Sequence, residues 1–338
     1  MDPISQGVLG ALAAGSFARR GEAKRGIAIG TLGGMAADLD ILIRAADDPL
    51  LTIEFHRHFT HALVFIPVGA LLVALFSWPL LGRALGFGRT YWFALLGYAT
   101  SGLLDACTSY GTQLLWPFSD ARVAWHIISI IDPIFTFTLL FLIAVAFFRN
   151  GPALCRVAAA FALAYLALGV VQNRRATAML EDLAAARGHS AERLSVKPAI
   201  ANLWLWRGLY IHGGRLYADA IRIPYWGTKS RIYEGESTPL VSAGAIGSPV
   251  PEGSALEKDL RRFDHFSDGY LGWHPDRPGL LGDLRYSTIP NEIAPLWGIA
   301  VDFSKPDQHA PFESVRQTDG ATRQRLLAML KGEDPPPP

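Results

Sequence analysis

Apolar and polar positions divide the chain into two parts at about Asn173. Before that residue, long apolar runs alternate with short polar loops, whereas most of the charge and much of the proline follow it. A bilayer core needs about 20 consecutive apolar residues. Five runs approach or reach that length, namely 27–43, 62–81, 91–104, 127–148 and 153–171. An earlier stretch, 8–17, is rich in small residues and predicts a closely packed or interfacial helix.

The second part has a different pattern. Residues 203–211 and 216–223 alternate apolar and polar side chains between Gly and Pro breaks, which is typical of strands and turns. The predicted fold is mainly α: a multi-pass transmembrane helical bundle of about four to five spans, followed by a smaller, β-containing extramembrane C-terminal domain. The expected ranges are 1–173 for the membrane-embedded domain, 174–332 for the α+β tail domain and 333–338 for a disordered proline tail.

Ionisable residues gather at the ends of the apolar runs. If the five spans cross in alternate directions, all of these residues lie on the same face of the membrane. Ionisable groups at the edge of a span are costly, so a functional site is the default interpretation. The residues are Asp38, Asp40, His56, His58, His61, Asp105, His126 and Asp132.

Imidazole and carboxylate groups together are ligands for zinc, and also for manganese or iron. His56 and His61 would lie about 140° apart on a helix, so they share a metal only if His56 lies in a loop. Asp38 and Asp40 would lie about 200° apart, so one carboxylate ligates while the other orients a histidine, unless the chain unwinds there. The pattern therefore predicts a divalent metal site, most simply for zinc.

Two alternatives remain open for these acids. Asp38 or Asp40 pairs with Arg44 or Arg57 in an ion pair that needs no metal. Asp132 precedes a proline and is equally well explained as a helix N-cap, with the proline at the first helical position.

Charge bears on partners and on orientation. A net charge of +1 gives no reason to expect a nucleic-acid partner. Under the alternating topology, the loops on the far side of the membrane from the site hold Arg19, Arg20, Lys24, Arg25, Arg83, Arg89, Arg149 and Arg156. The boundaries on the site's own side hold Arg44, Arg57, Arg122, Arg174 and Arg175. Because cytoplasmic loops are enriched in Lys and Arg, the site and the tail domain are expected on the outer, periplasmic face.

Three sequence blocks resemble a known family, the YdjM-like, LexA-binding, inner-membrane-associated proteins classed as metal-dependent hydrolases. The blocks are ADLD at 37–40, HRHFTH at 56–61 and LLDACTSYGTQLLWPF at 103–118, and the resemblance covers 1–173. The family is distantly similar to zinc-dependent phospholipase C and to a class of zinc nucleases, which are all-helical enzymes with clustered His and Asp ligands. The resemblance implies the metal ligands Asp38, Asp40, His56, His61 and Asp105.

This chain departs from the family at one position. The family usually has a histidine four residues before the aspartate of the third block, and here that residue is Ser101. The change implies one metal instead of several, a ligand supplied by His58 or His126, or a loss of catalysis.

The predicted function is a membrane-bound metal-dependent hydrolase of the bacterial inner membrane. Metal-activated water would attack an ester or phosphoester, with a lipid or lipid-linked substrate fitting the membrane location. His126 or Asp132 would serve as general base, and Arg57 would stabilise a phosphoryl oxyanion. The alternative is a non-catalytic membrane scaffold with a structural His/Asp metal or ion-pair cluster and a partner-binding C-terminal domain. The two differ in whether a coordination position is open, because structural metal sites are closed.

Overall fold

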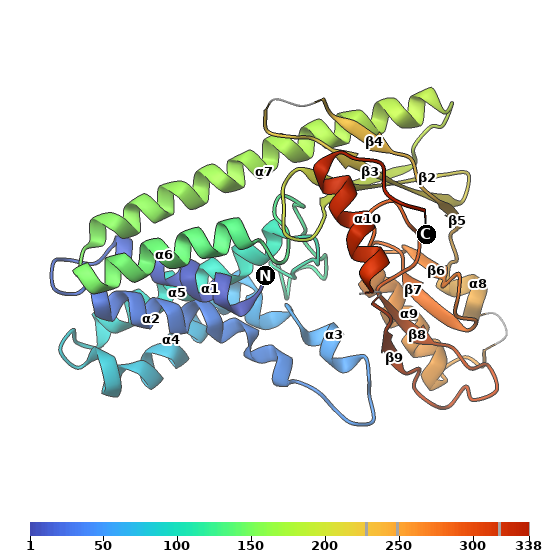
Figure 1. The fold of residues 1–338 in the computed structure, drawn as a ribbon. Helices are drawn as coiled ribbons and strands as arrows, with labels where there is room; N and C mark the ends of the chain where they lie inside the picture. The colour runs from blue at the N-terminus through green and yellow to red at the C-terminus, as the bar shows by residue number, and fades with distance from the viewer. Residues whose placement is uncertain (227–228, 248–249, 317–318, 338) are drawn as a thin grey trace. The chain divides into compact units, whose positions relative to one another are not determined.

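The computed structural model describes residues 1–226, 229–247, 250–316 and 319–337 (Figure 1). Its contacts divide the chain into two compact units. The helical unit comprises Met1–Ile43, Phe55–Val171 and Ile200–Leu203, and the sheet unit comprises Arg44–Glu54, Gln172–Ala199 and Trp204–Pro338. Pro338, the last residue of the predicted proline tail 333–338, lies outside the described residues.

Helices of the helical unit begin at clear sequence signals. Asp2 and Asp132 each accept a hydrogen bond from a first-turn backbone amide, and a proline follows each cap. The elements are α1 (Pro3–Ser16), α2 (Ala23–Ala36), the 3-10 turn η1 (Ala37–Leu42), α3 (Leu51–Phe55), η2 (Phe59–His61), η3 (Leu63–Phe65), α4 (Ile66–Ser77), η4 (Trp78–Gly82), α5 (Phe87–Cys107), α6 (Pro133–Arg149) and α7 (Pro152–Ala186). Residues 51–54 of α3 and the part of α7 after Val171 belong to the sheet unit.

Glycines allow α1, α2 and α5 to pack with their backbones nearly in contact. A Cβ on Gly10 would lie 2.3 Å from the Gly30 carbonyl oxygen, and one on Gly97 would lie 2.4 Å from the same atom. The Ser101 hydroxyl of α5 donates to the Gly34 carbonyl of α2 at 2.5 Å. This packing brings the C-terminal ends of α2 and α5 together.

Two helical segments among the described residues are long and apolar enough to cross a membrane, Leu63–Gly82 and Pro152–Ala186. The prediction of about four to five spans is therefore wrong. The run 27–43 does not form a membrane-spanning helix, because α2 ends at Ala36 and the chain turns into η1. α5 mixes its apolar residues with polar ones such as Asp105, and α6 is an apolar helix of only 17 residues.

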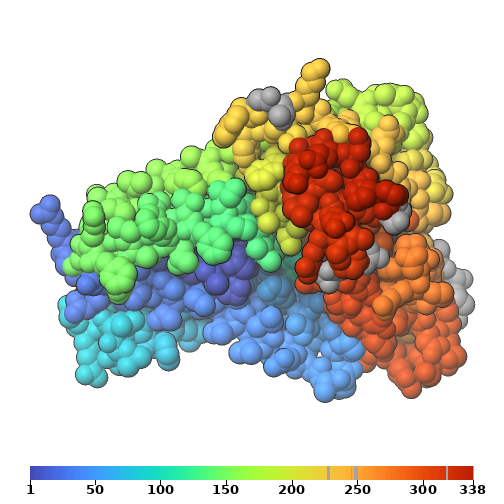
Figure 2. Space-filling model, viewed as in Figure 1, coloured from blue at the N-terminus to red at the C-terminus, as the bar shows by residue number. Residues whose placement is uncertain are grey.

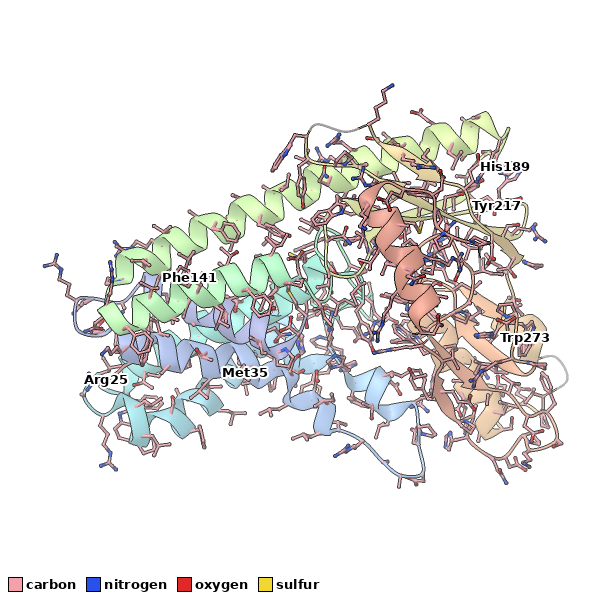
Figure 3. The ribbon with its side chains drawn as sticks, in the orientation of Figure 1. Arg25, Met35, Phe141, His189, Tyr217 and Trp273 are labelled. Carbon is pink, nitrogen blue, oxygen red and sulfur yellow. The ribbon has the colours of Figure 1, made fainter. Side chains whose placement is uncertain are left out.

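The helices at the periphery of this unit expose a large apolar surface. Figure 2 shows the surfaces of α6 and α7 along one side of the helical unit, and Figure 3 labels Phe141 on α6, whose side chain is 67% exposed. Apolar patches of this kind mark membrane or protein contacts. The residues, all at least 49% exposed, are Val64, Val68, Leu72, Leu75, Phe76, Phe137, Phe141, Phe148, Val157 and Leu163.

The described residues of the sheet unit form two antiparallel sheets. The first has the order β1-β2-β3-β4 with β5 also paired to β3, and the second has the order β6-β7-β8-β9. The strands are β1 (Arg193–Pro198), β2 (Leu205–His212), β3 (Arg215–Arg222), β4 (Arg231–Tyr233), β5 (Ser237–Pro239), β6 (Leu271–Trp273), β7 (Leu280–Asp283), β8 (Trp297–Ala300) and β9 (Phe312–Ser314). The helices are α8 (Ala243–Gly247), α9 (Ala255–Ser267) and α10 (Gly320–Lys331).

Helices cover both faces of the first sheet. Leu205 of β2 packs in one core cluster with Met329 of α10. Gly208, which points to the opposite face, brings the strand so close to α7 that a Cβ there would lie 2.9 Å from Leu180. A helical N-terminal part and a β-sheet C-terminal part are thus present as expected, but the sheet unit is not smaller than the helical unit.

The glycine contacts make a testable prediction. Gly30→Ala should destabilise the helical unit by about 1–3 kcal/mol, because its Cβ would lie 2.4 Å from the Gly10 carbonyl oxygen and 2.5 Å from the Ala14 Cβ. Gly88→Ala in α5 is the matched control, since nothing lies within 4 Å of its Cβ. Thermal unfolding in detergent, followed by circular dichroism, would measure both. Equal midpoints for the two variants would contradict the close packing.

Candidate metal centre

Three segments of the helical unit supply the charged residues of the candidate centre. η1, directly after α2, carries two acids, residues 56–61 follow α3, and the last turn of α5 carries a third acid. Because α2 and α5 approach closely, these segments meet. We call the five residues Asp38, Asp40, His56, His61 and Asp105 the His/Asp cluster.

Asp40 is buried and holds residues 56–61 in place. Its Oδ2 accepts hydrogen bonds from the Arg57 amide at 2.8 Å and from the Thr60 hydroxyl at 2.9 Å. Its Oδ1 lies 2.9 Å from His56 Nδ1, and its Oδ2 lies 3.2 Å from His61 Nδ1. A carboxylate at Nδ1 fixes the ring and directs Nε2 of a ligating histidine to its metal.

Arg57 sits in a strained turn that its contacts stabilise. Its φ of 63° is in the left-handed region, which costs an L residue about 1–2 kcal/mol. The Arg57 Nε lies 3.0 Å from Asp105 Oδ2, and Nη1 donates to the Thr108 hydroxyl at 2.9 Å. The guanidinium therefore pairs with Asp105, while the backbone of the same residue binds Asp40.

His61 lies between the acids of η1 and α5. Its Nε2 is 3.2 Å from Asp38 Oδ1 and 3.2 Å from Asp105 Oδ2. One ligand atom from each of these three residues can be chosen so that all lie within 4.8 Å of one another. Within the described part of the chain, His61 Nε2 and Asp105 Oδ2 are buried and make no hydrogen bond of normal geometry. An imidazole and two carboxylates are a donor set that fits a divalent cation.

A second donor set overlaps the first. Ligand atoms of Asp38, Asp40 and His56 also lie within 4.8 Å of one another. His56 has left the helix of α3 and its side chain is 24% exposed. Asp38 is common to both sets, so the cluster offers either one site or two sites that share a carboxylate.

Charge strongly couples the members of the cluster. Burial by itself would lower the pKa of His61, but the carboxylates of Asp105, Asp38 and Asp40 raise it to about 10. Burial would raise the pKa of Asp40, but its contacts with His56 and His61 hold it well below the usual range of a carboxyl. A metal ligand must have a free lone pair, so a cation at His61 Nε2 would displace a proton.

The two predicted general bases have other contacts. The His126 amide donates to the Thr108 carbonyl at 3.3 Å. Asp132 caps α6: it accepts from the Phe135 amide at 3.1 Å, and the Tyr165 hydroxyl donates to its two oxygens at 3.0 and 2.9 Å. A catalytic role for either residue stays a prediction.

Ser101 and His58, which the sequence analysis named in connection with the histidine implied by the family resemblance, both make packing contacts. Ser101 is fully buried, and its hydroxyl bonds α2 through Gly34. The His58 ring packs against Trp116 at 5.5 Å between ring centroids and against Phe55 at 5.2 Å. Ser101 therefore serves helix packing, and His58 lies in an aromatic setting.

Several residues around the cluster had no role in the sequence interpretation. Gln6 Nε2 of α1 donates to Asp38 Oδ1 at 3.2 Å. The Arg57 guanidinium lies 4.8 Å from the centre of the Tyr110 ring, and the His56 ring lies 5.5 Å from it. Thr60, Thr108 and Tyr110 belong to the three sequence blocks, so the blocks could have indicated their place at the site. Nothing in the sequence indicated Gln6 except that it is a polar residue just before an apolar stretch.

Among its described residues, the sheet unit holds one further group of possible ligands. Atoms of Asp48, Asp259 and His309 lie within 4.8 Å of one another. Arg262 already pairs with Asp48 at 3.0 Å and with Asp259 at 3.1 Å. A cation there would have to compete with a guanidinium, so the His/Asp cluster is the stronger candidate.

Two apolar helical segments long enough to cross a membrane, together with the largely buried His/Asp cluster, indicate a membrane-associated protein with a candidate metal centre. The family described as "YdjM inner membrane protein" matches residues 1–176, and the chain belongs to this family. The resemblance inferred from the three sequence blocks is thereby confirmed. Comparisons with curated proteins and with solved structures found no match.

The contacts of Asp40 and Asp38 predict losses of stability of different size when each side chain is removed. Asp40→Ala leaves the buried Arg57 amide and the Thr60 hydroxyl without an acceptor, so it should cost about 3–5 kcal/mol of unfolding free energy. Asp38→Ala removes the hydrogen bond from Gln6 and the contact with His61, which keeps Asp40 and Asp105, so it should cost less, about 1–2 kcal/mol. Unfolding with chelator present would compare them without any metal contribution. Similar losses in both variants would contradict the organising role of Asp40.

Proposed function

We propose that this protein is a membrane-bound metal-dependent hydrolase acting on an ester or phosphoester. The observation that carries the proposal is the meeting of Asp38, His61 and Asp105: one ligand atom from each lies within 4.8 Å of the others, and, among the described residues, His61 Nε2 and Asp105 Oδ2 are buried without a hydrogen bond. A divalent cation held there, zinc before manganese or iron, would supply Lewis-acid polarisation and would lower the pKa of water toward about 7.

Neighbouring side chains orient the ligands and balance their charge. Asp40 orients the two imidazoles through their Nδ1 atoms. Arg57 balances the charge of Asp105 and keeps its Oδ2 in place. The proposal also includes Arg57 as the group that stabilises a phosphoryl oxygen and His126 or Asp132 as the general base. Substitution of a residue with one of these roles should reduce turnover without loss of the metal.

Exposed apolar side chains beside the cluster favour a lipid or lipid-linked substrate. η1 alternates its acids with Leu39, Ile41 and Leu42, which are 62%, 56% and 64% exposed. A substrate with an apolar tail would cover this surface while its ester group approached Asp38, whose side chain is 12% exposed.

Metal content is the decisive first measurement. Protein purified in detergent without chelator should hold about one or more equivalents of zinc, manganese or iron. His61→Ala and Asp105→Ala should lose it, whereas His58→Ala should keep it, because His58 packs against aromatic rings. Elemental analysis would measure all four proteins. A folded wild-type protein without metal would contradict the hydrolase proposal.

Activity on esters tests the next step. Metal-loaded wild-type protein should hydrolyse members of a panel of phosphoesters and lipid esters, and Asp105→Ala should reduce turnover at least about 100-fold. A metal-loaded protein that is inactive over the panel and holds its metal in a closed, four-ligand site would favour the scaffold alternative. That alternative draws support from Arg57 and His61, which already offset part of the carboxylate charge.

We further propose that the His/Asp cluster faces the periplasm. The α1–α2, α4–α5 and α6–α7 loops lie together at the other end of the bundle, joined by hydrogen bonds from Arg89 to the Phe17 carbonyl and from the Lys24 amide to Asn150. Arginines concentrate on these loops, which favours a cytoplasmic location. Because α7 starts at that end, the sheet unit that follows it would also be periplasmic.

Cysteine labelling in spheroplasts would test this orientation. A cysteine replacing the exposed Asp120, near the cluster end, should react with a membrane-impermeant maleimide, while Arg83→Cys should react only after lysis. The native Cys107 and Cys155 are buried, which keeps the background low. The reverse pattern would place the cluster in the cytoplasm.

A further inference from the structure

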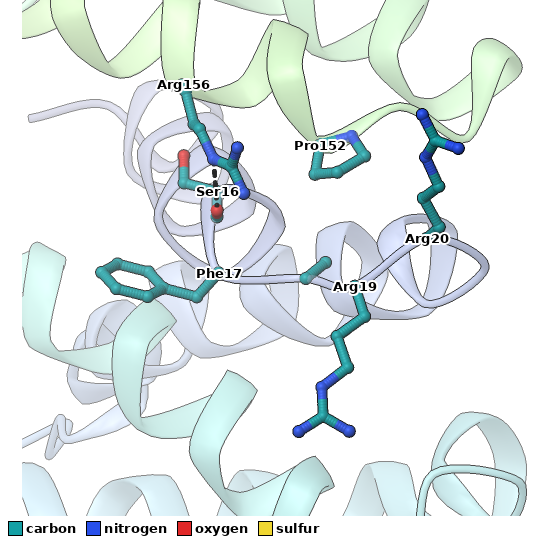
Figure 4. Close-up of a pocket in the computed structure, with 7 residues that line it drawn as sticks. Ser16, Phe17, Arg19, Arg20, Pro152 and Arg156 are labelled. Atoms are coloured by element: carbon teal, nitrogen blue, oxygen red, sulfur yellow. Dashed lines mark hydrogen bonds between the residues drawn. The ribbon is translucent and has the colours of Figure 1, made fainter.

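An open pocket of about 670 Å³ lies at the end of the bundle remote from the His/Asp cluster (Figure 4). Its walls are the loop after α1, including Phe17, Arg19 and Arg20, and the start of α7, including Pro152 and Arg156. The volume is within the range of about 300–1000 Å³ that is usual for small-molecule sites.

The pocket carries positive charge that no lining acid offsets. Three of its lining residues are arginines and none is acidic. Arg20 points toward α7, from which Arg156 projects, and the Arg156 Nε donates to the Ser16 carbonyl at 3.1 Å (Figure 4). Glu22, the nearest acid in sequence, is already bound by Arg89 at 2.7 Å. An anion in the pocket would therefore meet two guanidinium groups without a competing carboxylate.

Apolar surface continues from the pocket along the bundle. Phe17 at its edge is 60% exposed, Val157 on the next residue of α7 is 58% exposed, and Phe148 before the α6–α7 loop is 79% exposed. A ligand with an anionic head and apolar chains would match both features, whereas a free anion would use only the arginines.

We propose that this pocket binds the phosphate headgroup of an anionic phospholipid of the surrounding membrane. Arg20 and Arg156 would hold the phosphate, and the acyl chains would lie along the exposed apolar faces of α6 and α7. Basic pockets between helices at a membrane surface bind such headgroups. The proposal is independent of the metal centre, because the two sites lie at opposite ends of the bundle.

Native mass spectrometry of the full-length, delipidated protein would test the proposal. Phosphatidylglycerol is the probe and phosphatidylethanolamine the lipid without net charge. Arg20→Gln with Arg156→Gln should weaken the first phosphatidylglycerol binding event about 25-fold, or about fivefold per arginine. The control, Arg25→Gln with Arg83→Gln, removes two exposed arginines outside the pocket and should bind like wild type.

Three results would overturn the proposal. The first is an equal loss of phosphatidylglycerol binding in the control variant, and the second is a wild-type protein that does not prefer phosphatidylglycerol over phosphatidylethanolamine. The third is displacement of the lipid by millimolar inorganic phosphate, which would show that the pocket binds the free anion. Thermal midpoints would confirm that both variants fold. If the double variant does not, Arg20→Gln alone, at an exposed loop position, should still weaken binding about fivefold.

Discussion

The carboxylate of Asp40 is the contact on which the candidate centre depends. It accepts the amide of Arg57, a residue with a φ of 63°, and it lies against Nδ1 of both His56 and His61. Without this acceptor, a strained turn and two imidazoles would lose their common anchor. The position of the His/Asp cluster is therefore decided by one buried anion and not by the geometry of a regular helix.

The Asp40 carboxylate lies close to its partners because α1, α2 and α5 pack closely. Backbone contacts at Gly10, Gly30 and Gly97 bring α1, α2 and α5 together, and the Ser101 hydroxyl joins α5 to α2. The same packing places Asp38 and Asp105 on either side of His61. Ser101, at the position where the family resemblance implies a histidine, contributes to this packing.

The membrane boundary was the least predictable part of the fold. Hydropathy alone treats every apolar run alike, whether its side chains face lipid or other helices. The run 27–43 ends in a 3-10 turn at the cluster, and α5 is covered on several sides by α1, α2 and α4, so neither has to be uniformly apolar. The segments Leu63–Gly82 and Pro152–Ala186 meet the criterion because each contains a long apolar stretch at the periphery of the helical unit, where most exposed side chains are apolar.

The sequence by itself determined the family, the helical and β-containing parts, and the residues that form the cluster, because motif spacing and apolar runs are local properties. Only the tertiary structure decided that Asp40 contacts both histidines, that Arg57 pairs with Asp105, and that Gln6 joins the site from α1. These contacts join residues far apart in the chain. Their geometry depends on how closely the helices pack, which no single segment of sequence specifies.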